Sequence, residues 1–215
     1  MSESEIEAAL GKVTAAQTAF RSALAFYRKL TGTPAPALFD GRPAALRHDA
    51  FAGARGYPDR NVMLKALAVG KTAAEVGVQH GNISHFILSN LGVETLHLFD
   101  MLPDQIRQDV RSDPRVRIHA GDSSRNLATL PDDLLDWCYI DGDHRLAGAQ
   151  KDARVAVAKT RPGGVLLFND YTPWSANEVM PYGVMTVVNA LVNEGHDLVG
   201  VALNPWGYFD IALRN

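Results

Sequence analysis

The strongest chemical signal in the sequence is a pair of polar clusters, each directly after an apolar run. Asp141-Gly142-Asp143-His144 follows the run at residues 137–140, and Asn169-Asp170 follows the run at residues 165–168. If the two runs are neighbouring parallel strands, their ends lie roughly 5 Å apart, and two carboxylates and an amide converge. Like charges this close raise each other's pKa unless a cation lies between them. Oxygen ligands predict a hard cation, with Mg²⁺ first and Mn²⁺ or Ca²⁺ as alternatives.

A second signal is a glycine-containing turn between an apolar run and a helical pattern. Gly77 permits a tight turn, and Gly81 lets the backbone pass close to a ligand at the helix start. The dinucleotide fingerprint G-x-G-x-x-G fails, because it requires glycine where the chain has Gln79 and Asn82, so a nicotinamide oxidoreductase is disfavoured. Glu75 would oppose a pyrophosphate, but it suits a ligand that carries an ammonium group and a sulfonium, such as S-adenosylmethionine.

Alternating strand and helix patterns would position both signals. Short apolar runs recur roughly every 20 to 28 residues, at residues 73–78, 95–99, 116–119, 137–140 and 165–168. Helical patterns lie between and after them, at residues 84–91, 104–110, 147–159 and 184–194. This alternation predicts right-handed crossovers and a doubly wound, mostly parallel α/β sheet, whose ligands bind beyond the carboxyl ends of the strands. Two final strands, 198–203 and 208–213, are joined by a loop too short for a crossover and are expected to be antiparallel.

These motifs resemble a known family. Glu75-x-Gly77-x-x-x-Gly81 resembles the first motif of the class I S-adenosylmethionine-dependent methyltransferases, and Ser84 brings it closer to the branch of macrocin-type O-methyltransferases. Asp141-Gly142-Asp143-His144 with Pro162-Gly163-Gly164 and Asn169-Asp170-Tyr171 resembles metal-dependent O-methyltransferases of sugars and natural products. Catechol O-methyltransferase shares the arrangement more distantly. The resemblance covers about residues 70–171 and implies a Rossmann-like, seven-stranded sheet of order 3-2-1-4-5-7-6.

The resemblance also implies a role for each site residue. The implied cofactor ligands are Glu75, Gly77, Gly81, Ser84, Asp100, Asp122, Ser123 and Asp141. Asp100 would accept the ribose hydroxyls, and Asp122, supported by Ser123, would meet the adenine amino group. Asp141, Asn169 and Asp170 are implied metal ligands, and His144, with Asp141 beside it, is the implied general base. Several relatives have an acidic residue at the position of Asn169, so its amide would lower the metal affinity.

Structural alternatives remain open for these residues. Asp100 could be a solvated helix cap, and Asp122 could be the N-cap of the following helix, a role compatible with adenine binding. Asp141 and Asp170 could only cap loops, and His144 could be a surface histidine. Asp143 reads as a turn residue more than as a fourth metal ligand.

The predicted function is S-adenosylmethionine-dependent methyl transfer to a hydroxyl of a small organic acceptor, with a divalent metal. The alternatives are a metal-independent methyltransferase, in which Asp141 and Asp170 contact the substrate, and a non-catalytic protein that binds S-adenosylmethionine or a nucleoside. The aromatic segment at residues 171–183 and Trp206 are expected to wall the acceptor pocket.

Composition argues against other partners. The net charge of -3 and the lack of a basic stripe disfavour nucleic acid. No apolar stretch approaches the ~20 residues of a membrane span, and the acidic start differs from a signal peptide. Cys138 permits no internal disulfide and reads as a buried core residue, so a cytoplasmic protein is expected.

Residues 1–61 are predicted to form a helical extension and connector, and residues 62–215 the S-adenosylmethionine-binding domain. A long helix with a capping box at Ser2 and Glu5 is expected. Its apolar stripe, interrupted by Gln17, consists of Ile6, Leu10, Val13, Phe20, Leu24, Tyr27 and Leu30. The stripe would pack on the chain's own domain or form a homodimer contact. Residues 31–61 are rich in Gly and Pro, and this composition predicts a connector with little regular structure.

Overall fold

The computed structural model describes residues 2–33, 42–205 and 207–215, and the chain divides into two units, Met1–Leu38 and Phe39–Asn215. The first unit contains one helix, α1 (Glu3–Thr31). Its N-cap Ser2 accepts from the Glu5 N–H, and the Glu5 carboxylate accepts from the Ser2 N–H, so the predicted capping box is confirmed. The helix ends at Gly32, in the left-handed conformation.

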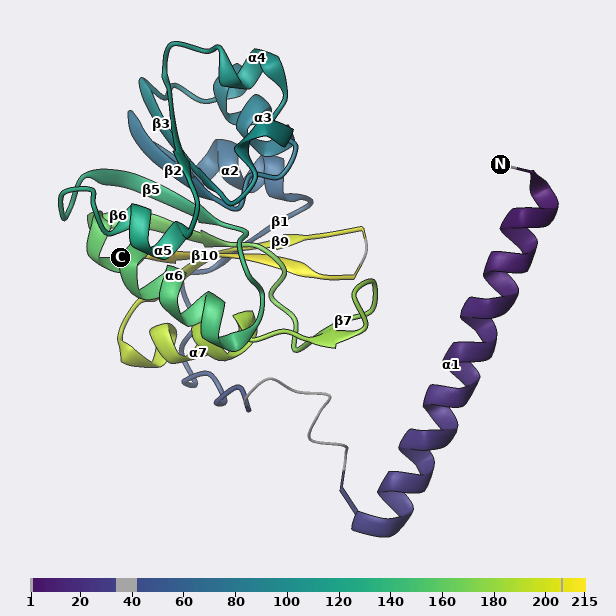
Figure 1. The fold of residues 1–215 in the computed structure, drawn as a ribbon. Helices are drawn as coiled ribbons and strands as arrows, with labels where there is room; N and C mark the ends of the chain where they lie inside the picture. The colour runs from purple at the N-terminus through teal and green to yellow at the C-terminus, as the bar shows by residue number, and fades with distance from the viewer. Residues whose placement is uncertain (1, 34–41, 206) are drawn as a thin grey trace. The chain divides into compact units, whose positions relative to one another are not determined.

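An eight-stranded sheet forms the centre of the second unit (Figure 1). Its strands are β1 (Arg55–Tyr57), β2 (Thr72–Val76), β3 (Thr95–Asp100), β4 (Val116–Ala120), β5 (Leu135–Ile140), β6 (Thr160–Phe168), β9 (Asp197–Leu203) and β10 (Phe209–Arg214). The order across the sheet is β1-β9-β10-β6-β5-β2-β3-β4, and only β10 runs antiparallel to its neighbours. The predicted order of seven strands is confirmed, and β1 adds an eighth beside β9.

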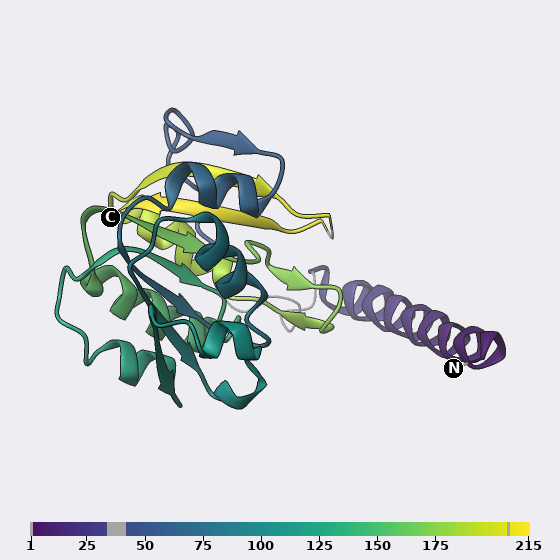
Figure 2. The same ribbon diagram turned by 90° about the horizontal axis from the view of Figure 1, so that it is seen from above.

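Helices cover both faces of this sheet (Figure 2). They are α2 (Arg60–Leu67), α3 (Asn82–Asn90), α4 (Gln108–Arg111), α5 (Ser123–Leu127), α6 (Leu146–Lys159) and α7 (Val184–Glu194). Among the described residues, no helix combines the length and the apolar character that a membrane crossing requires.

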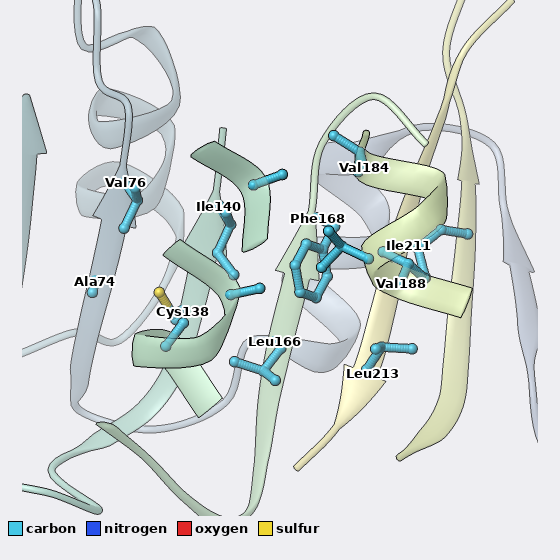
Figure 3. Close-up of a cluster of buried hydrophobic side chains, with 14 of the residues drawn as sticks. Ala74, Val76, Cys138, Ile140, Leu166, Phe168, Val184, Val188, Ile211 and Leu213 are labelled. Atoms are coloured by element: carbon cyan, nitrogen blue, oxygen red, sulfur yellow. The ribbon is translucent and has the colours of Figure 1, made fainter. Parts of the chain in front are cut away.

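The alternation of side chains along β5 shows how the two faces are separated. Trp137 and Tyr139 pack in one buried cluster, with side chains of α2, α3 and α4. Cys138 and Ile140 point the other way, into a cluster with side chains of α5, α6 and α7 (Figure 3). Cys138 is fully buried, as predicted. Burial on both faces explains why the central strands are almost continuously apolar.

Three parts of this unit differ from the sequence prediction. The expected connector contains β1, which pairs with β9, and the start of α2, whose N-cap is Asp59. The short strand β1 was missed because Gly56 is its middle residue and Pro58 follows it directly, and both are residue types that predict turns. The helix predicted at residues 104–110 is divided into η2 (Pro103–Gln105) and α4, because Ile106 is extended and enters the core. The segment expected to wall the pocket forms a hairpin of β7 (Trp174–Ser175) and β8 (Met180–Pro181). Trp206 lies outside the described residues.

Candidate active site

A cavity of about 850 Å³ opens at the carboxyl ends of the parallel strands. It lies where the chain order reverses, because β2 has β3 on one side and β5 on the other, and ligands bind at such a point in open α/β sheets. The predicted site residues that line it are Glu75, Gly77, Asp100, Asp122, Ser123, Asp141, His144, Asn169 and Asp170. Gly81 and Ser84 are not part of the wall.

The turn after β2 touches the end of β5. The Asp141 N–H donates to the Val76 carbonyl at 2.7 Å. Gly77 has a φ of +80°, and a Cβ there would lie 2.0 Å from the Asp141 carbonyl oxygen. Only glycine therefore lets the turn approach the backbone of Asp141 this closely.

Asp100 holds the same turn from the side of β3. Its Oδ2 accepts from the backbone N–H groups of Val78 and Gln79, both at 2.8 Å, and its Oδ1 accepts from the Leu102 N–H at 2.7 Å. An ionised carboxylate has about four acceptor positions. Three are occupied within the protein, so one position on Oδ1 remains for a ligand.

Glu75 is a buried carboxyl group in the cavity wall. It is 1 % exposed, and the Ser84 hydroxyl donates to its Oε2 at 2.5 Å. Burial raises the pKa of Glu75 to about 8, and the charges of Asp141 and Asp100 act in the same direction. Ser84 thus acts on the ligand site through Glu75. Gly81 serves as the N-cap of α3.

At the end of β4, Asp122 and Ser123 face the cavity from the first turn of α5. The Asp122 carboxylate accepts from the Arg125 N–H at 2.9 Å, so the helix-capping alternative holds while the residue still lines the cavity. The Ser123 hydroxyl donates to Asp152 at 2.6 Å. Asp152 is 3 % exposed, and burial raises its pKa. Sequence reasoning missed Asp152, because it is one acidic residue within an ordinary helical pattern.

The polar clusters that follow β5 and β6 come together in the cavity wall. Asn169 donates from its amide nitrogen to Oδ1 of Asp141 at 2.8 Å. The Nε2 atom of His144 lies 3.4 Å from the same Oδ1 and 4.0 Å from Oδ2 of Asp170. The predicted convergence of two carboxylates and an amide is therefore present, and His144 lies beside them. Asp170 has a φ of +52°, a conformation of a kind that clusters at functional sites.

The His144 ring is held by stacking and surrounded by negative charge. It stacks on Tyr182 with ring centroids 4.5 Å apart and planes inclined by 7°. Burial opposes the charged imidazolium, but Asp141, Asp170 and Glu178 outweigh it and raise the pKa of His144. Its Nε2 is buried without a hydrogen bond of good geometry, so this nitrogen can take a proton.

Comparisons with known proteins agree with this geometry. A family model described as a methyltransferase domain matches residues 74–171, which span every strand end at the cavity. Residues 74–171 are therefore similar to a methyltransferase domain, and the second unit has the Rossmann-like methyltransferase fold. A comparison with curated proteins gave no match.

Solved structures share the fold of the methyltransferase domain. The N-methyltransferase NodS of Bradyrhizobium japonicum WM9, in complex with S-adenosyl-L-homocysteine, has a TM-score of 0.56 at 16% identity over 73% of this chain and 85% of its own. A protein of Corynebacterium glutamicum has a TM-score of 0.53 at 21% identity over 90% and 95% of the two chains. An S-adenosylmethionine-dependent methyltransferase of Mesorhizobium loti has a TM-score of 0.52 at 14% identity over 68% and 92%. At these identities the likeness shows the fold alone.

A buried network behind the methyltransferase site was not predicted. Asp210 is 1 % exposed on β10, and its Oδ2 lies 3.2 Å from Nε of Arg60 and accepts from the Tyr139 hydroxyl at 3.1 Å. Burial raises the pKa of Asp210 to about 7, although Arg60 opposes this. Arg60 lines the cavity, so it places a fixed positive charge near Asp141 and Asp170. A carboxylate within the apolar strand Phe209–Arg214 was the signal that could have revealed this network.

The segment after β6 supplies part of the cavity wall. Glu178, between β7 and β8, and Tyr182 line the cavity, and both belong to the segment at residues 171–183 that was predicted to wall a pocket. Asp143 accepts from the Arg145 N–H at 3.0 Å, the arrangement of a turn residue.

A matched pair of glycine substitutions tests the contact between β2 and β5. Gly77 and Gly163 have nearly equal positive φ angles, but a Cβ at Gly163 would meet no atom within 4 Å. We expect Gly163→Ala to lower the free energy of unfolding by about 1–2 kcal/mol. Gly77→Ala should lower it by about 3 kcal/mol or more, because the Asp141 backbone must also move. Denaturant unfolding measures both, and equal losses would contradict the role of the close approach.

Proposed function

We propose that this domain transfers the methyl group of S-adenosylmethionine to a hydroxyl of a small organic acceptor, with a divalent cation held by Asp141, Asn169 and Asp170. The observation that carries the proposal is the cavity itself. Its wall contains a buried carboxyl group and strand-end acids after β2, β3 and β4, and two carboxylates, an amide and a histidine after β5 and β6. This division suits a cationic donor beside an acceptor that must lose a proton.

The cofactor end offers a partner for each polar part of S-adenosylmethionine. Glu75 would accept from the ammonium group, and the remaining acceptor position of Asp100 would take one ribose hydroxyl. Asp122 would meet the adenine amino group, while Ser123 extends from the same turn. Because Asp100 also binds the Gly77 turn, ribose binding and the shape of the turn would be coupled.

The acceptor end has the ligand chemistry of a hard-cation site. Two carboxylates and an amide line one region of the cavity. Asn169 directs its nitrogen towards Asp141, and a half-turn of the amide would present its oxygen instead. Among the described residues, no group of three His, Cys, Asp or Glu side chains forms a metal site, so the set depends on the Asn169 amide. A divalent cation bound there would favour the ionised form of the acceptor hydroxyl.

In the proposed reaction, His144 removes the proton from the acceptor hydroxyl. The acceptor oxygen forms a bond to the methyl carbon while the carbon–sulfur bond breaks, and S-adenosylhomocysteine leaves. The imidazolium is then stabilised by Asp141 and Asp170, which lie beside Nε2. Proton removal of this kind typically contributes ~10²–10⁴-fold, and alignment of the two reactants can supply ~7–11 kcal/mol.

The position of Arg60 favours a second candidate, methyl transfer without a metal. Its guanidinium lines the cavity and is fixed by Asp210 and Tyr139. A permanent positive charge there would offset Asp141 and Asp170 and favour an ionised acceptor. The acceptor would then contact the two carboxylates directly.

The protonation of Glu75 gives a test of the cofactor end. With a pKa of about 8, this carboxyl group is mostly protonated at pH 7. A cationic ligand favours the ionised form, so binding of S-adenosylmethionine should release close to one proton at pH 7. The affinity should rise with pH and level off above pH 8. Calorimetry in buffers of different ionisation enthalpy measures the release.

Two variants control the protonation experiment. Glu75→Gln should abolish the proton release and weaken binding. Ser84→Ala should shift the release to higher pH, because the Ser84 hydroxyl lowers the pKa of Glu75. Binding heats that are independent of the buffer in the unaltered protein would rule out Glu75 as the ammonium ligand.

Substitution of the carboxylates tests the acceptor end. We expect Asp141→Asn and Asp170→Asn each to lower the rate by about 100-fold or more, while the affinity for S-adenosylhomocysteine changes little. The assay follows S-adenosylhomocysteine formation with a panel of phenols and sugars, before and after chelation and after added Mg²⁺. Asp143→Asn is the matched control and should keep its activity. Full turnover of either variant would refute the metal proposal.

Chelation combined with substitution of Arg60 separates the two candidates. If no metal is needed, activity survives a chelator and falls by about tenfold or more in Arg60→Gln. Because Asp210 would lose its partner, the double variant Arg60→Gln with Asp210→Asn controls for destabilisation. Loss of activity on chelation, with recovery on Mg²⁺ addition, would eliminate the metal-independent candidate.

A further inference from the structure

The helix α1 carries a regular apolar stripe along its whole length. Its 29 residues span about 44 Å. The stripe positions alternate in steps of four and three, at Ile6, Leu10, Val13, Gln17, Phe20, Leu24 and Tyr27. This is the heptad repeat of helices that pair along a narrow seam. Taken by itself, the unit leaves Leu10 62 % and Val13 53 % exposed, and none of the helix is buried.

The charges beside the stripe are divided between the two ends of the helix. Glu3, Glu5 and Glu7 lie in the first two turns, and Arg21, Arg28 and Lys29 lie in the second half. Lys12 is the one basic residue in the first half of the helix. At heptad spacing, one flank of the stripe contains Glu7, Thr14, Arg21 and Arg28. The other flank contains Ala9, Ala16 and Ala23. One flank is therefore acidic at its start and basic at its end, and the other consists of small residues.

We propose that α1 pairs with α1 of a second copy of this chain, in antiparallel orientation. In a parallel pair, the acidic ends would lie together, and the flank charges would face alanines. In an antiparallel pair, residues of the same flank face each other, so Glu7 meets Arg21 or Arg28 of the partner subunit. Opposite charges beside an apolar seam set the partner and orientation of paired helices.

The alanine flank supports the same arrangement. Ala9, Ala16 and Ala23 would face the same alanines of the second helix, and small side chains allow a close approach, towards the short end of the usual 8–10 Å between helix axes. Gln17 lies near the middle of the stripe, where one polar residue limits the alignments at some expense of stability. This pairing is independent of the proposed reaction.

The experiment measures the mass of the full chain by sedimentation equilibrium at tens of micromolar. We expect twice the chain mass of 23.3 kDa. Leu10→Glu, within the stripe, should yield a monomer with unchanged domain stability. Ala15→Glu, on the opposite side of the helix, is the control and should remain dimeric. A monomeric unaltered chain, as expected if α1 packs on its own methyltransferase domain, would overturn the proposal.

Charge exchange tests the orientation. Glu7→Arg should weaken the dimer by about tenfold, because it places like charges opposite each other in both halves of the pair. Adding Arg21→Glu and Arg28→Glu to that variant should restore the affinity. If the dimer dissociation constant is the same in all of these charge variants, the antiparallel arrangement is overturned.

Disulfide formation between different positions gives a second readout. A mixture of the Ala9→Cys and Ala23→Cys chains, or of the Ala16→Cys and Ala23→Cys chains, should form mixed crosslinks on oxidation. The native Cys138 is buried and should not compete. If neither mixture forms crosslinks, while two copies of the Leu10→Cys chain crosslink efficiently to each other, the helices pair in parallel and the proposal is overturned.

Discussion

The close approach of the Gly77 turn to the backbone of Asp141 is the constraint on which the rest of the site depends. It joins the two halves of the sheet where their chain order diverges, and the Val76–Asp141 hydrogen bond fixes the distance. Asp100 secures the same turn from the other side. The residues proposed to bind the cofactor, after β2 and β3, and those proposed to act on the acceptor, after β5 and β6, therefore lie at one edge of the sheet, as two reactants that must be aligned require.

Electrostatics within the cavity set a second constraint. Most charged groups in its wall are acidic, and several are too buried for water to stabilise their ionised forms. Burial raises the pKa of Glu75 in the wall and of Asp210 behind it, and of these two only Asp210 has an ion-pair partner, Arg60. Such a cavity favours positively charged occupants, which is consistent with a sulfonium donor at one end and with either a metal ion or the arginine at the other.

The sequence predicted the parallel sheet and the meeting of Asp141, Asn169 and Asp170, because apolar runs that end in polar residues mark strand ends. The strand order and the role of His144 came from the family resemblance and not from these runs. The sequence did not predict the Arg60–Asp210 network, whose members are 150 residues apart in the chain and meet only through the pairing of the last strand. Hydrogen bonding also altered expected roles. Ser84 supports Glu75 from within the core, and Asp100 accepts two hydrogen bonds from the turn after β2 and one from Leu102. These details depend on side-chain geometry and not on spacing.

The residues that follow β8 contact His144 at two points. Tyr182 stacks on the His144 ring, and the Gly183 N–H donates to the His144 carbonyl at 2.7 Å. A shift of the hairpin that admitted a bulky molecule would therefore also move the His144 imidazole away from Asp141 and Asp170. If His144 is the general base, as proposed, it would be out of position while the hairpin is displaced and back in position once the hairpin returns. Activation of water against the methyl donor would thereby be avoided.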